Sequence, residues 1–405
     1  MKVKKLVVAM FAAGMVASPL LAHATNGDEM MAVGSQSTAL GGTGVAHFMG
    51  AESVWANPAM LGKSKGAEVT GGVVIFTPKV SNTGVPALSG VTSESKAETS
   101  YIPDVSYSSR ISDSLTYGIA VAGIAGMGVD YQTSPATHIY AKSALSILRV
   151  LPTITYNTKD YAVGFSPVFQ SGSLRLSYNA SGLGMGNINP TGTSDSSSGF
   201  GYSLGGYFNA SSALTLAASY QSEIAAKYGT QISNAGVGFG LTGASAFGDD
   251  LNQPAEMKAG IAYAMSDSVT LTVDYKQIQW GSAKGYKDFN WKDQTIVAVG
   301  AKYAANGYWL GLGYNSGNDP IENLAAGVYR QECINFFNNM FFPAVVTNSY
   351  TFGGGFELSK SLALEASAVI TPEVTKVTPV TSFFAGNNTT KHSQQSYSAS
   401  LRYKF

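Results

Sequence analysis

The sequence predicts an all-β fold, a transmembrane antiparallel β-barrel of about fourteen strands with an N-terminal hatch (plug) inside its lumen. Three observations lead to this prediction. Charged residues make up 12% of the 405-residue chain, about half the share typical of soluble globular proteins. Segments of alternating apolar and polar residues recur from residue 66 to the C-terminus. The connections between these segments alternate between short and long, as in outer-membrane barrels.

Residues 1–24 have the composition of a cleaved secretory signal peptide. The first five residues include three lysines, an apolar stretch follows, and Ala22-His23-Ala24 supplies an A-x-A cleavage site. A membrane-anchoring helix is the alternative, but the apolar stretch is too short to span a bilayer. We therefore expect an exported protein whose mature chain begins at Thr25.

The composition of the mature chain narrows the possible functions. Removing residues 1–24 removes three lysines and no acidic residue, which leaves 22 basic and 25 acidic residues. The mature chain therefore lacks the excess of positive charge that would indicate nucleic-acid binding. A single cysteine, Cys333, excludes an internal disulfide framework and leaves open whether it is free or paired between chains. Because no cluster of His, Cys and Asp has metal-ligand spacing, we expect neither a metal nor a cofactor.

Period-two alternation predicts the strands of the barrel domain, which spans 66–405. In the last strand, for example, Tyr397, Leu401 and Phe405 alternate with polar residues such as Ser398. The predicted strands lie near 66–78, 97–110, 114–127, 140–157, 160–179, 198–210, 212–231, 253–266, 267–280, 292–304, 306–319, 347–359, 361–376 and 393–405. Single-chain outer-membrane barrels have an even number of strands, as predicted here.

The connections between the predicted strands differ in length on the two sides of the barrel. Tight turns such as 157–160 and 266–268 follow the even strands. Longer polar or Gly-rich segments follow the odd strands, at 79–96, 128–139, 180–197, 232–252, 281–291, 320–346 and 377–392. This asymmetry predicts short periplasmic turns, long extracellular loops and two periplasmic termini. A soluble β-sandwich shares the alternation but does not require the asymmetry.

Residues 25–65 do not alternate, and we predict that they form the hatch. A barrel of about fourteen strands has a lumen too wide for wall side chains to fill. A compact, nearly uncharged segment before the first strand has a suitable place and size to close it. A disordered leader is the alternative, but apolar residues such as Met30, Leu40 and Trp55 argue against disorder.

This segment also carries a resemblance to a known family. The stretches 37–46 and 51–59, with Trp55 and the tripeptide Asn57, Pro58 and Ala59, resemble the hatch of the FadL/TodX family of outer-membrane transporters. Weaker matches along the mature chain are 218–222, Gln253-Pro254, Tyr275 with Trp280, 298–303 and 312–314. Tyr403-Lys404-Phe405 resembles the C-terminal signal of proteins inserted by the outer-membrane assembly machinery.

The resemblance implies passive uptake of hydrophobic small molecules, such as long-chain fatty acids, across the outer membrane of a Gram-negative bacterium, and no enzymatic activity. It also implies capture by the extracellular loops, binding in the lumen and lateral release into membrane lipid through a kink in the third strand. That strand, 114–127 here, carries Gly118, Gly123 and Gly126, and Gly128 follows it. Glycines weaken strands and mark bulges. The expected partners are the cargo, the membrane lipid and the outer-membrane assembly machinery, and we expect no others. We expect the protein to be a monomer.

Two sets of residues are candidates for substrate binding. An apolar run in a loop otherwise exposed to water needs a reason, although the loop packing on itself is the alternative. The loop candidates are Leu241, Phe247, Phe336, Phe337, Met340, Phe341 and Phe342. Basic side chains that face the lumen would hold a carboxylate head group, namely Arg149, Lys258, Lys276 and Lys302. Their alternative role is pairing with the lumenal acids Glu223, Glu256, Asp274 and Glu365.

Two other functions are compatible with an outer-membrane barrel. A general porin for small polar solutes would need an open lumen and a ring of charge, which the predicted hatch and the sparse charge argue against. An outer-membrane lipase would need a nucleophile, and residues 201–205 match G-x-S-x-G. That motif requires a strand–turn–helix context, whereas here it lies inside a predicted strand. The sequence leaves open whether the cargo is a fatty acid, an alkane or an aromatic compound.

Overall fold

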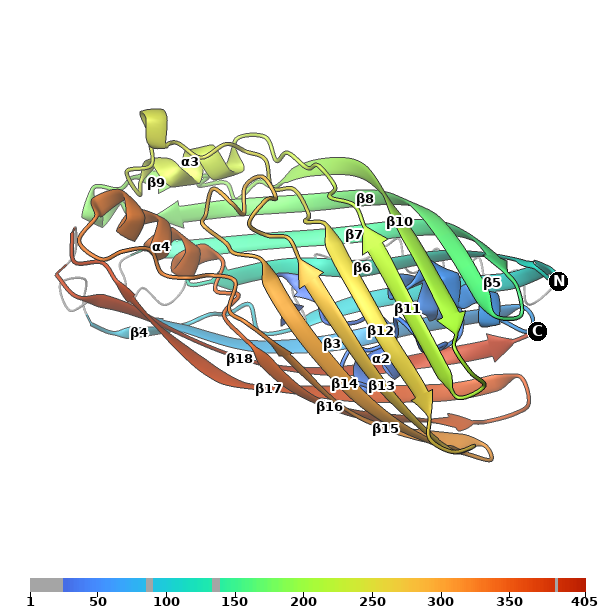
Figure 1. Cartoon of the computed structure of the whole chain (residues 1–405). Helices are drawn as coiled ribbons and strands as arrows, with labels where there is room; N and C mark the ends of the chain where they lie inside the picture. The colour runs from blue at the N-terminus through green and yellow to red at the C-terminus, as the bar shows by residue number, and fades with distance from the viewer. Residues whose placement is uncertain (1–24, 85–89, 133–138, 383–384) are drawn as a thin grey trace.

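The structure is a computed structural model that describes residues 25–84, 90–132, 139–382 and 385–405, so the predicted signal peptide lies outside the described residues. Fourteen long antiparallel strands form the wall, and the last of them pairs with the first to close the barrel (Figure 1). They are β3 (Glu68–Thr83), β5 (Ser100–Ser112), β6 (Leu115–Asp130), β7 (Tyr140–Asn157), β8 (Tyr161–Asn179), β10 (Asp195–Asn209), β11 (Leu214–Gln221), β12 (Glu256–Ala264), β13 (Val269–Ile278), β14 (Gln294–Ala305), β15 (Tyr308–Gly317), β16 (Asn348–Glu357), β17 (Leu362–Pro379) and β18 (Asn387–Lys404). The predicted strand number is confirmed.

The two faces of the wall have the polarity of a protein surrounded by lipid. In β18, Tyr397 and Leu401 are 49% and 46% exposed on the outside, whereas Ser398 and Ser400 are buried in the lumen. A water-soluble sandwich would place the same residues the other way round. The apolar side chains therefore face outwards and the polar ones inwards, as in transmembrane barrels. No helix in the described part of the chain is long and apolar enough to cross a membrane.

Residues 25–67, called the inner segment below, lie inside the barrel near the end that holds the C-terminus (Figure 1). The segment contains β1 (Thr25–Asn26), β2 (Glu29–Met30), α2 (Ser35–Ala39) and the 3-10 helices η1 (Ala51–Trp55) and η2 (Pro58–Lys63). It touches opposite walls: the backbone N–H of Gly41 donates to Thr351 of β16 at 2.9 Å, and Thr155 of β7 donates to the carbonyl of Pro58 at 2.7 Å.

Close approach of the inner segment to the wall depends on wall glycines. A Cβ atom on Gly313 of β15 would lie 2.1 Å from the backbone nitrogen of Gly41. A Cβ atom on Gly164 of β8 would lie 2.4 Å from the carbonyl carbon of Pro58. Such short contacts leave no room for any side chain, so glycine allows the two backbones to pack directly.

The tripeptide from Asn57 to Ala59 docks the inner segment onto β10. The Asn57 side chain caps η2 by accepting from the backbone N–H of Ala59 at 2.9 Å. Its amide donates to the carbonyls of Val45 and Gly206, at 2.8 and 3.2 Å. Because Asn57 and Ala59 are fully buried, these contacts fix the path of the segment at one point of the wall.

A buried ionic network makes a second anchor near the C-terminus. Arg402 of β18 contacts Glu68 at 2.8 Å, Glu365 at 2.9 Å and Glu52 of η1 at 3.6 Å. It also donates to the backbone carbonyl of Met49 at 2.7 Å. Removing one partner from a buried network of this kind leaves uncompensated charge behind, so the network holds η1 against β18.

The loops at the opposite end of the barrel contain short strands and helices that the alternation did not predict. These elements are β4 (Thr92–Glu94), β9 (Asn187–Ile188), α3 (Gln231–Val237), α4 (Tyr329–Phe341) and the 3-10 helices η4 (Ser181–Leu183) and η5 (Gly243–Ser245). The strand predicted over 212–231 was too long, because β11 ends at Gln221. Ile224 and Tyr228 keep the alternation beyond that point, but both are fully buried: Tyr228 packs in the loop core, and Ile224 packs with Leu61 of the inner segment and with wall residues.

Candidate ligand-binding site in the lumen

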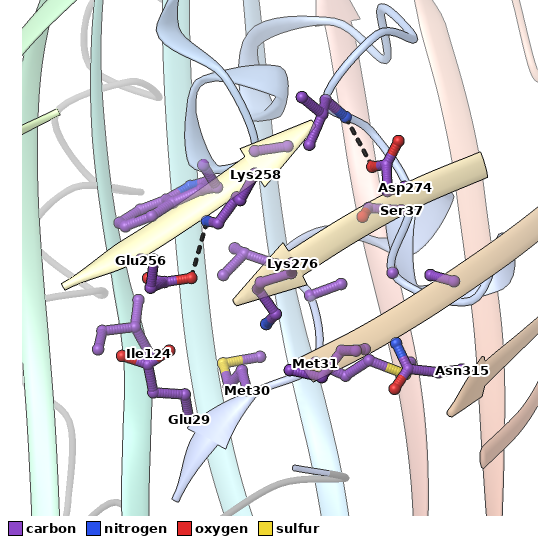
Figure 2. A pocket seen from close by; sticks show the side chains of 18 of the residues that line it. Glu29, Met30, Met31, Ser37, Ile124, Glu256, Lys258, Asp274, Lys276 and Asn315 are labelled. Carbon is purple, nitrogen blue, oxygen red and sulfur yellow. Dashed lines mark hydrogen bonds and ion pairs between the residues drawn. The ribbon is translucent and has the colours of Figure 1, made fainter. Parts of the chain in front are cut away.

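A cavity of about 90 Å³ lies between the inner segment and the wall (Figure 2). One part of its lining is apolar and the other is charged. The apolar residues that line it include Met30, Met31, Val33, Trp55, Ile124 and Ile296. The charged residues are Glu29, Glu52, Arg149, Glu256, Lys258, Asp274 and Lys276. An apolar lining combined with convergent polar groups is a common feature of small-molecule sites, and here the charged share of the lining is large.

Three of the four predicted basic residues converge on this cavity. Arg149 lies on β7, Lys258 on β12 and Lys276 on β13. The fourth, Lys302, does not join them. Its cross-strand partner on β13 is Thr270, six residues from Lys276 along the strand and therefore about 20 Å away at the usual rise.

Lys302 belongs to a different cavity of about 280 Å³, which Arg402 and Glu365 also line. Its ammonium donates to the Gln36 side chain at 2.6 Å and lies 5.3 Å from the centre of the Trp309 ring. All four basic residues therefore face the lumen. Lys302 differs from the other three in its position along the barrel axis.

The predicted pairing with acids holds for two of the three cations in the lumenal cavity. Lys258 contacts Glu256 at 3.0 Å, as Figure 2 shows, and Arg149 lies 3.9 Å from Glu29 and 4.0 Å from Glu256. Among the described residues, Lys276 has no carboxylate oxygen within 4.0 Å. Of the three cations it is the one without an ion-pair partner in the described part of the chain.

The protonation of Glu29 adds to the positive character of the cavity. Glu29 lies on the inner segment, where burial and the neighbouring Glu256 raise its pKa to about 8. At neutral pH it therefore carries no charge for most of the time. Of the other lining acids, Glu52 pairs with Arg402, so Glu256 and Asp274 are the carboxylates that remain beside Arg149, Lys258 and Lys276. One of the three basic side chains is therefore without a balancing carboxylate.

The barrel wall opens beside this cavity. β5 and β6 pair from Leu115 to Ala122, the partner of Asp104, and no further. β6 has a register shift between Gly123 and Ala125. The segment that precedes β5 contacts β6 again at Asp130, whose carbonyl accepts from the backbone N–H of Lys96 at 2.8 Å. Residues 123–129 thus form an edge without a β5 partner, which we call the wall gap.

A hairpin of the inner segment covers the wall gap from inside. β1 and β2 pair with each other over 25–30. Glu29 then pairs with Ala125, and the N–H of Gly126 donates to the carbonyl of Asp28 at 2.9 Å. One face of the hairpin borders the lumenal cavity through Met30, which packs against Phe76 and Ile102 of the wall. The other borders a second cavity of about 20 Å³.

The predicted glycines of the third strand divide into two groups. Gly126 and Gly128 line the small cavity at the wall gap, and Gly123 begins the register shift. Gly118 instead pairs with Ser108 of β5 in the intact part of the wall. A Cβ atom there would lie 2.7 Å from Leu61 of η2, so Gly118 makes room for the inner segment and lies outside the wall gap.

The predicted loop candidates form a packed core and no open pocket. Leu241, Phe247, Phe336, Phe337, Met340, Phe341 and Phe342 are all at most 4% exposed. Phe337 contacts the rings of Phe247, Phe289 and Phe341 at centroid distances of 5.1 to 5.5 Å. None of these candidates lines the lumenal cavity or the small cavity at the wall gap. The alternative of a loop packed on itself therefore describes their arrangement.

Several cavity residues escaped sequence reasoning. Glu29, Met30 and Met31 lie in the inner segment, whose contacts have no periodic pattern. Ile124 lies at the register shift, and the flanking Gly123 and Gly126 were the available signal for it. The predicted hatch residue Trp55 does line the cavity, and its indole N–H donates to Ser106 of β5 at 3.2 Å.

The G-x-S-x-G match has no catalytic context. Residues 201–205 lie within β10, paired on one side with β8 and partly with β11 on the other. The chain makes no sharp strand–turn–helix connection there, which a nucleophile of that type needs. Among the described residues, no group of three His, Cys, Asp or Glu side chains is arranged to hold a metal ion.

Comparisons with known proteins agree with this architecture. The *Pseudomonas putida* toluene transporter TodX superposes with a TM-score of 0.67 at 17% identity, over 93% of this chain and 99% of that one. A *Pseudomonas aeruginosa* FadL homologue gives 0.69 at 15% identity, over 94% and 100%. The *Ralstonia pickettii* toluene transporter TbuX gives 0.65 at 18% identity, over 93% and 99%. These likenesses establish the fold.

Sequence comparison identifies the family. No curated protein sequence matches the chain. A family described as outer membrane protein transport protein (OMPP1/FadL/TodX) matches residues 13–326, well over half of the chain. It is a family of transport proteins and not of enzymes, in agreement with the prediction. The chain therefore belongs to the OMPP1/FadL/TodX family of outer membrane transport proteins.

Proposed function

We propose that this protein carries hydrophobic small molecules with an anionic head group, long-chain fatty acids or related compounds, passively across the outer membrane. The steps are capture by the extracellular loops, binding in the lumenal cavity and lateral release into the bilayer. One observation supports this most: a cavity with an unpaired lysine, Lys276, and an apolar wall lies directly beside the wall gap.

The two parts of the cavity suit the two parts of such a ligand. Hydrogen bonds from charged donors to a carboxylate are stronger than neutral ones, and Arg149, Lys258 and Lys276 supply such donors on one side. Met30, Ile124 and their apolar neighbours would receive the start of the hydrocarbon chain. Removing each methylene from water contributes about 0.8 kcal/mol, so the chain itself would supply most of the affinity.

Lateral release requires the hairpin over 25–30 to leave the wall gap. The cavity of about 90 Å³ is too small for a whole long chain, so the chain would extend through the gap once the hairpin has moved. An alkyl chain that passes from the cavity into lipid stays in apolar surroundings. No energy source is then needed, because the ligand is never returned to water.

The inner segment would act as the hatch, with Asn57, Pro58 and Ala59 as its main docking point. Under this proposal residues 1–24 are removed on export, 25–65 form the hatch and 66–405 the barrel. The protein would insert as a monomer with the help of the outer-membrane assembly machinery. Loop capture would require α4 to move, because Phe336, Phe337 and Phe341 are buried in the present arrangement.

The relatives support an apolar cargo, and the cavity suggests which kind. Two of the similar structures are toluene transporters and one is a FadL homologue. Toluene carries no charge, so it would form no ion pair with the three cations that line the cavity. A buried cationic group is expensive to keep without a partner, so the unpaired charge favours an anionic ligand.

The test is uptake of labelled oleate and labelled toluene by a Gram-negative host that lacks its own transporter of this family. Cells with and without this protein are compared. We expect the protein to raise oleate uptake. Uptake of toluene alone would contradict the anionic cargo, and passage of small sugars without uptake of either would indicate an open porin.

A further inference from the structure

The tip of the hairpin that covers the wall gap is held by the loop between β13 and β14, residues 279–293. Gly27 and Asp28 form the turn of the hairpin. Gly27 has a φ of +66°, and a Cβ atom there would lie 2.6 Å from the Trp280 ring. The hydroxyl of Tyr286 donates to the carboxylate of Asp28. The turn is therefore seated in a socket made by this loop.

The Asp28 carboxyl is deeply buried and has few partners. Asp28 is 1% exposed and Tyr286 is fully buried. Oδ2 of Asp28 accepts the Tyr286 hydroxyl, whereas Oδ1 has no hydrogen-bond partner among the described residues. Gln253 in turn donates to the Tyr286 oxygen at 3.1 Å and holds the ring in place. Since an unpaired buried carboxyl is costly, the Tyr286 hydroxyl stabilises the seated hairpin.

Asp28 also connects this loop to the wall gap and to the helix above it. Its backbone carbonyl accepts from the N–H of Gly126 at the edge of β6, at 2.9 Å. On the other side, Trp291 packs against Tyr286 with ring centroids 4.9 Å apart. The Trp291 indole donates to Asn338 of α4 at 3.1 Å. Continuous contacts thus run from the extracellular helix α4 to the covered gap.

We propose that Asp28 and Tyr286 form a latch, a pair of positioning residues through which the loop 279–293 holds the hairpin across the wall gap. A ligand that displaces this loop would break the latch and free the hairpin. The purpose of the latch rests on the proposed function, but its existence is tested without transport.

The latch makes release of the hairpin depend on pH. Burial raises the pKa of Asp28 from 3.8 to about 7 in the seated state, and release into water restores the lower value. Between these two values the seated state binds more protons than the released one. The seated state therefore loses stability as pH rises from about 4 to about 7, and no more is lost above that. The titratable and charged groups facing Asp28 are Arg149 of β7, Glu29 of the hairpin, Tyr228 and Tyr286.

The experiment measures exposure of the hairpin by thiol labelling. Asn26→Cys, 3% exposed before substitution, is introduced into a Cys333→Ala background of the full barrel in lipid vesicles. The rate of reaction with a water-soluble maleimide is measured with Asp28 or with Asp28→Asn. Dividing the first rate by the second at each pH removes the thiol's own pH dependence. We expect this ratio to rise about tenfold per pH unit at most between about pH 4.5 and pH 7.

Substitution of Tyr286 supplies the second arm. Tyr286→Phe removes only the hydroxyl, and we expect labelling to rise about tenfold near pH 8, for a lost charge-assisted bond of about 1.4 kcal/mol or more. Tyr228→Phe is the matched control, because Tyr228 is fully buried nearby and its hydroxyl has no hydrogen-bond partner among the described residues.

The latch would be overturned if the ratio of the two labelling rates did not change with pH, or if the two Tyr→Phe substitutions had equal effects. Labelling that follows these expectations without oleate uptake would uphold the latch and refute the proposed function. Oleate uptake together with labelling that does not respond to Tyr286→Phe or to pH would uphold the proposed function and refute the latch.

Discussion

Lys258 on β12 lies directly opposite Lys276 on β13, as cross-strand partners in the barrel wall. Like charges in this position destabilise a sheet. Glu256 relieves the repulsion on the side of Lys258, which it contacts at 3.0 Å. Two adjacent lysines in the wall of the lumenal cavity lower stability, and an anionic ligand bound by both would explain the arrangement.

Lys276→Met is expected to impair oleate uptake and leave toluene uptake unchanged. A hydrogen bond to a charged group contributes about 1.5–3 kcal/mol, which corresponds to roughly a tenfold to hundredfold loss of oleate affinity. The matched control is Lys302→Met, because Lys302 faces the lumen but lines a different cavity. Saturation of uptake against oleate concentration measures the effect, and equal losses in the two variants would show that the cavity charge has no specific role.

Oleate affinity is expected to fall as pH rises through about 8, the pKa to which burial and Glu256 raise Glu29. Below that pH Glu29 is neutral and the cavity keeps its extra positive charge. Above it the new carboxylate cancels that charge and repels the ligand, so we expect a decrease of about tenfold, one pKa unit in free energy. Titration of the purified barrel with oleate measures this, and Glu29→Gln should bind with the same affinity throughout.

Gly313→Ala is expected to open a leak for small polar solutes. The added Cβ atom would lie 2.1 Å from the nitrogen of Gly41 and push the inner segment off β15. Overpacking of this kind costs about 1–3 kcal/mol. Gly206→Ala is the control, because its Cβ atom would meet nothing closer than 3.6 Å. Swelling of barrel-containing vesicles in small sugars reports the leak, and vesicles that remain tight with Gly313→Ala would argue against the hatch role.

Cys333 is expected to be nearly inert towards thiol reagents in the folded barrel. It is 2% exposed on α4, and burial raises the pKa of its thiol to about 11. At about pH 8 only about one thiol in a thousand is then ionised, and the thiolate is the reactive form. Mass spectrometry after maleimide treatment measures the modification. Rapid reaction at neutral pH would mean that α4 opens readily without ligand.

The sequence was sufficient for the wall and insufficient for the loops. Period-two alternation gave fourteen strands because each wall residue faces either lipid or lumen. Helix α4 has no such contrast, since residues on all its sides from Glu332 to Phe341 are buried. Its apolar residues were therefore compatible with a pocket and with the packed core that they form, and the sequence did not distinguish the two.

The sequence predicted which side of the barrel wall each site residue faces, but not its position along the barrel axis. Alternation placed Arg149, Lys258, Lys276 and Lys302 in the lumen, but only the register between neighbouring strands separates Lys302 from the rest. The wall gap shows the same limit. Gly123 and Gly126 marked a weak strand, whereas the loss of pairing with β5 depends on the register shift beside Ile124 and on the hairpin that replaces β5.

The central claim is that the ligand leaves through the wall gap after the hairpin moves. Glu29 and Ala125 are cross-strand partners, and the bond between Gly126 and Asp28 identifies a non-hydrogen-bonded pair. Cα atoms in such pairs are about 4.5 Å apart, within reach of a disulfide. Glu29→Cys with Ala125→Cys, in a Cys333→Ala background, would therefore fasten the hairpin across the gap.

The decisive measurement is oleate transport into lipid vesicles by this double-cysteine barrel before and after reduction, with the cross-link verified by mass spectrometry. The reduced protein is its own control for the two substitutions. We predict that the cross-linked barrel transports no oleate above the rate of empty vesicles and that reduction restores transport. Transport by the fully cross-linked barrel at the reduced rate would contradict release through the wall gap.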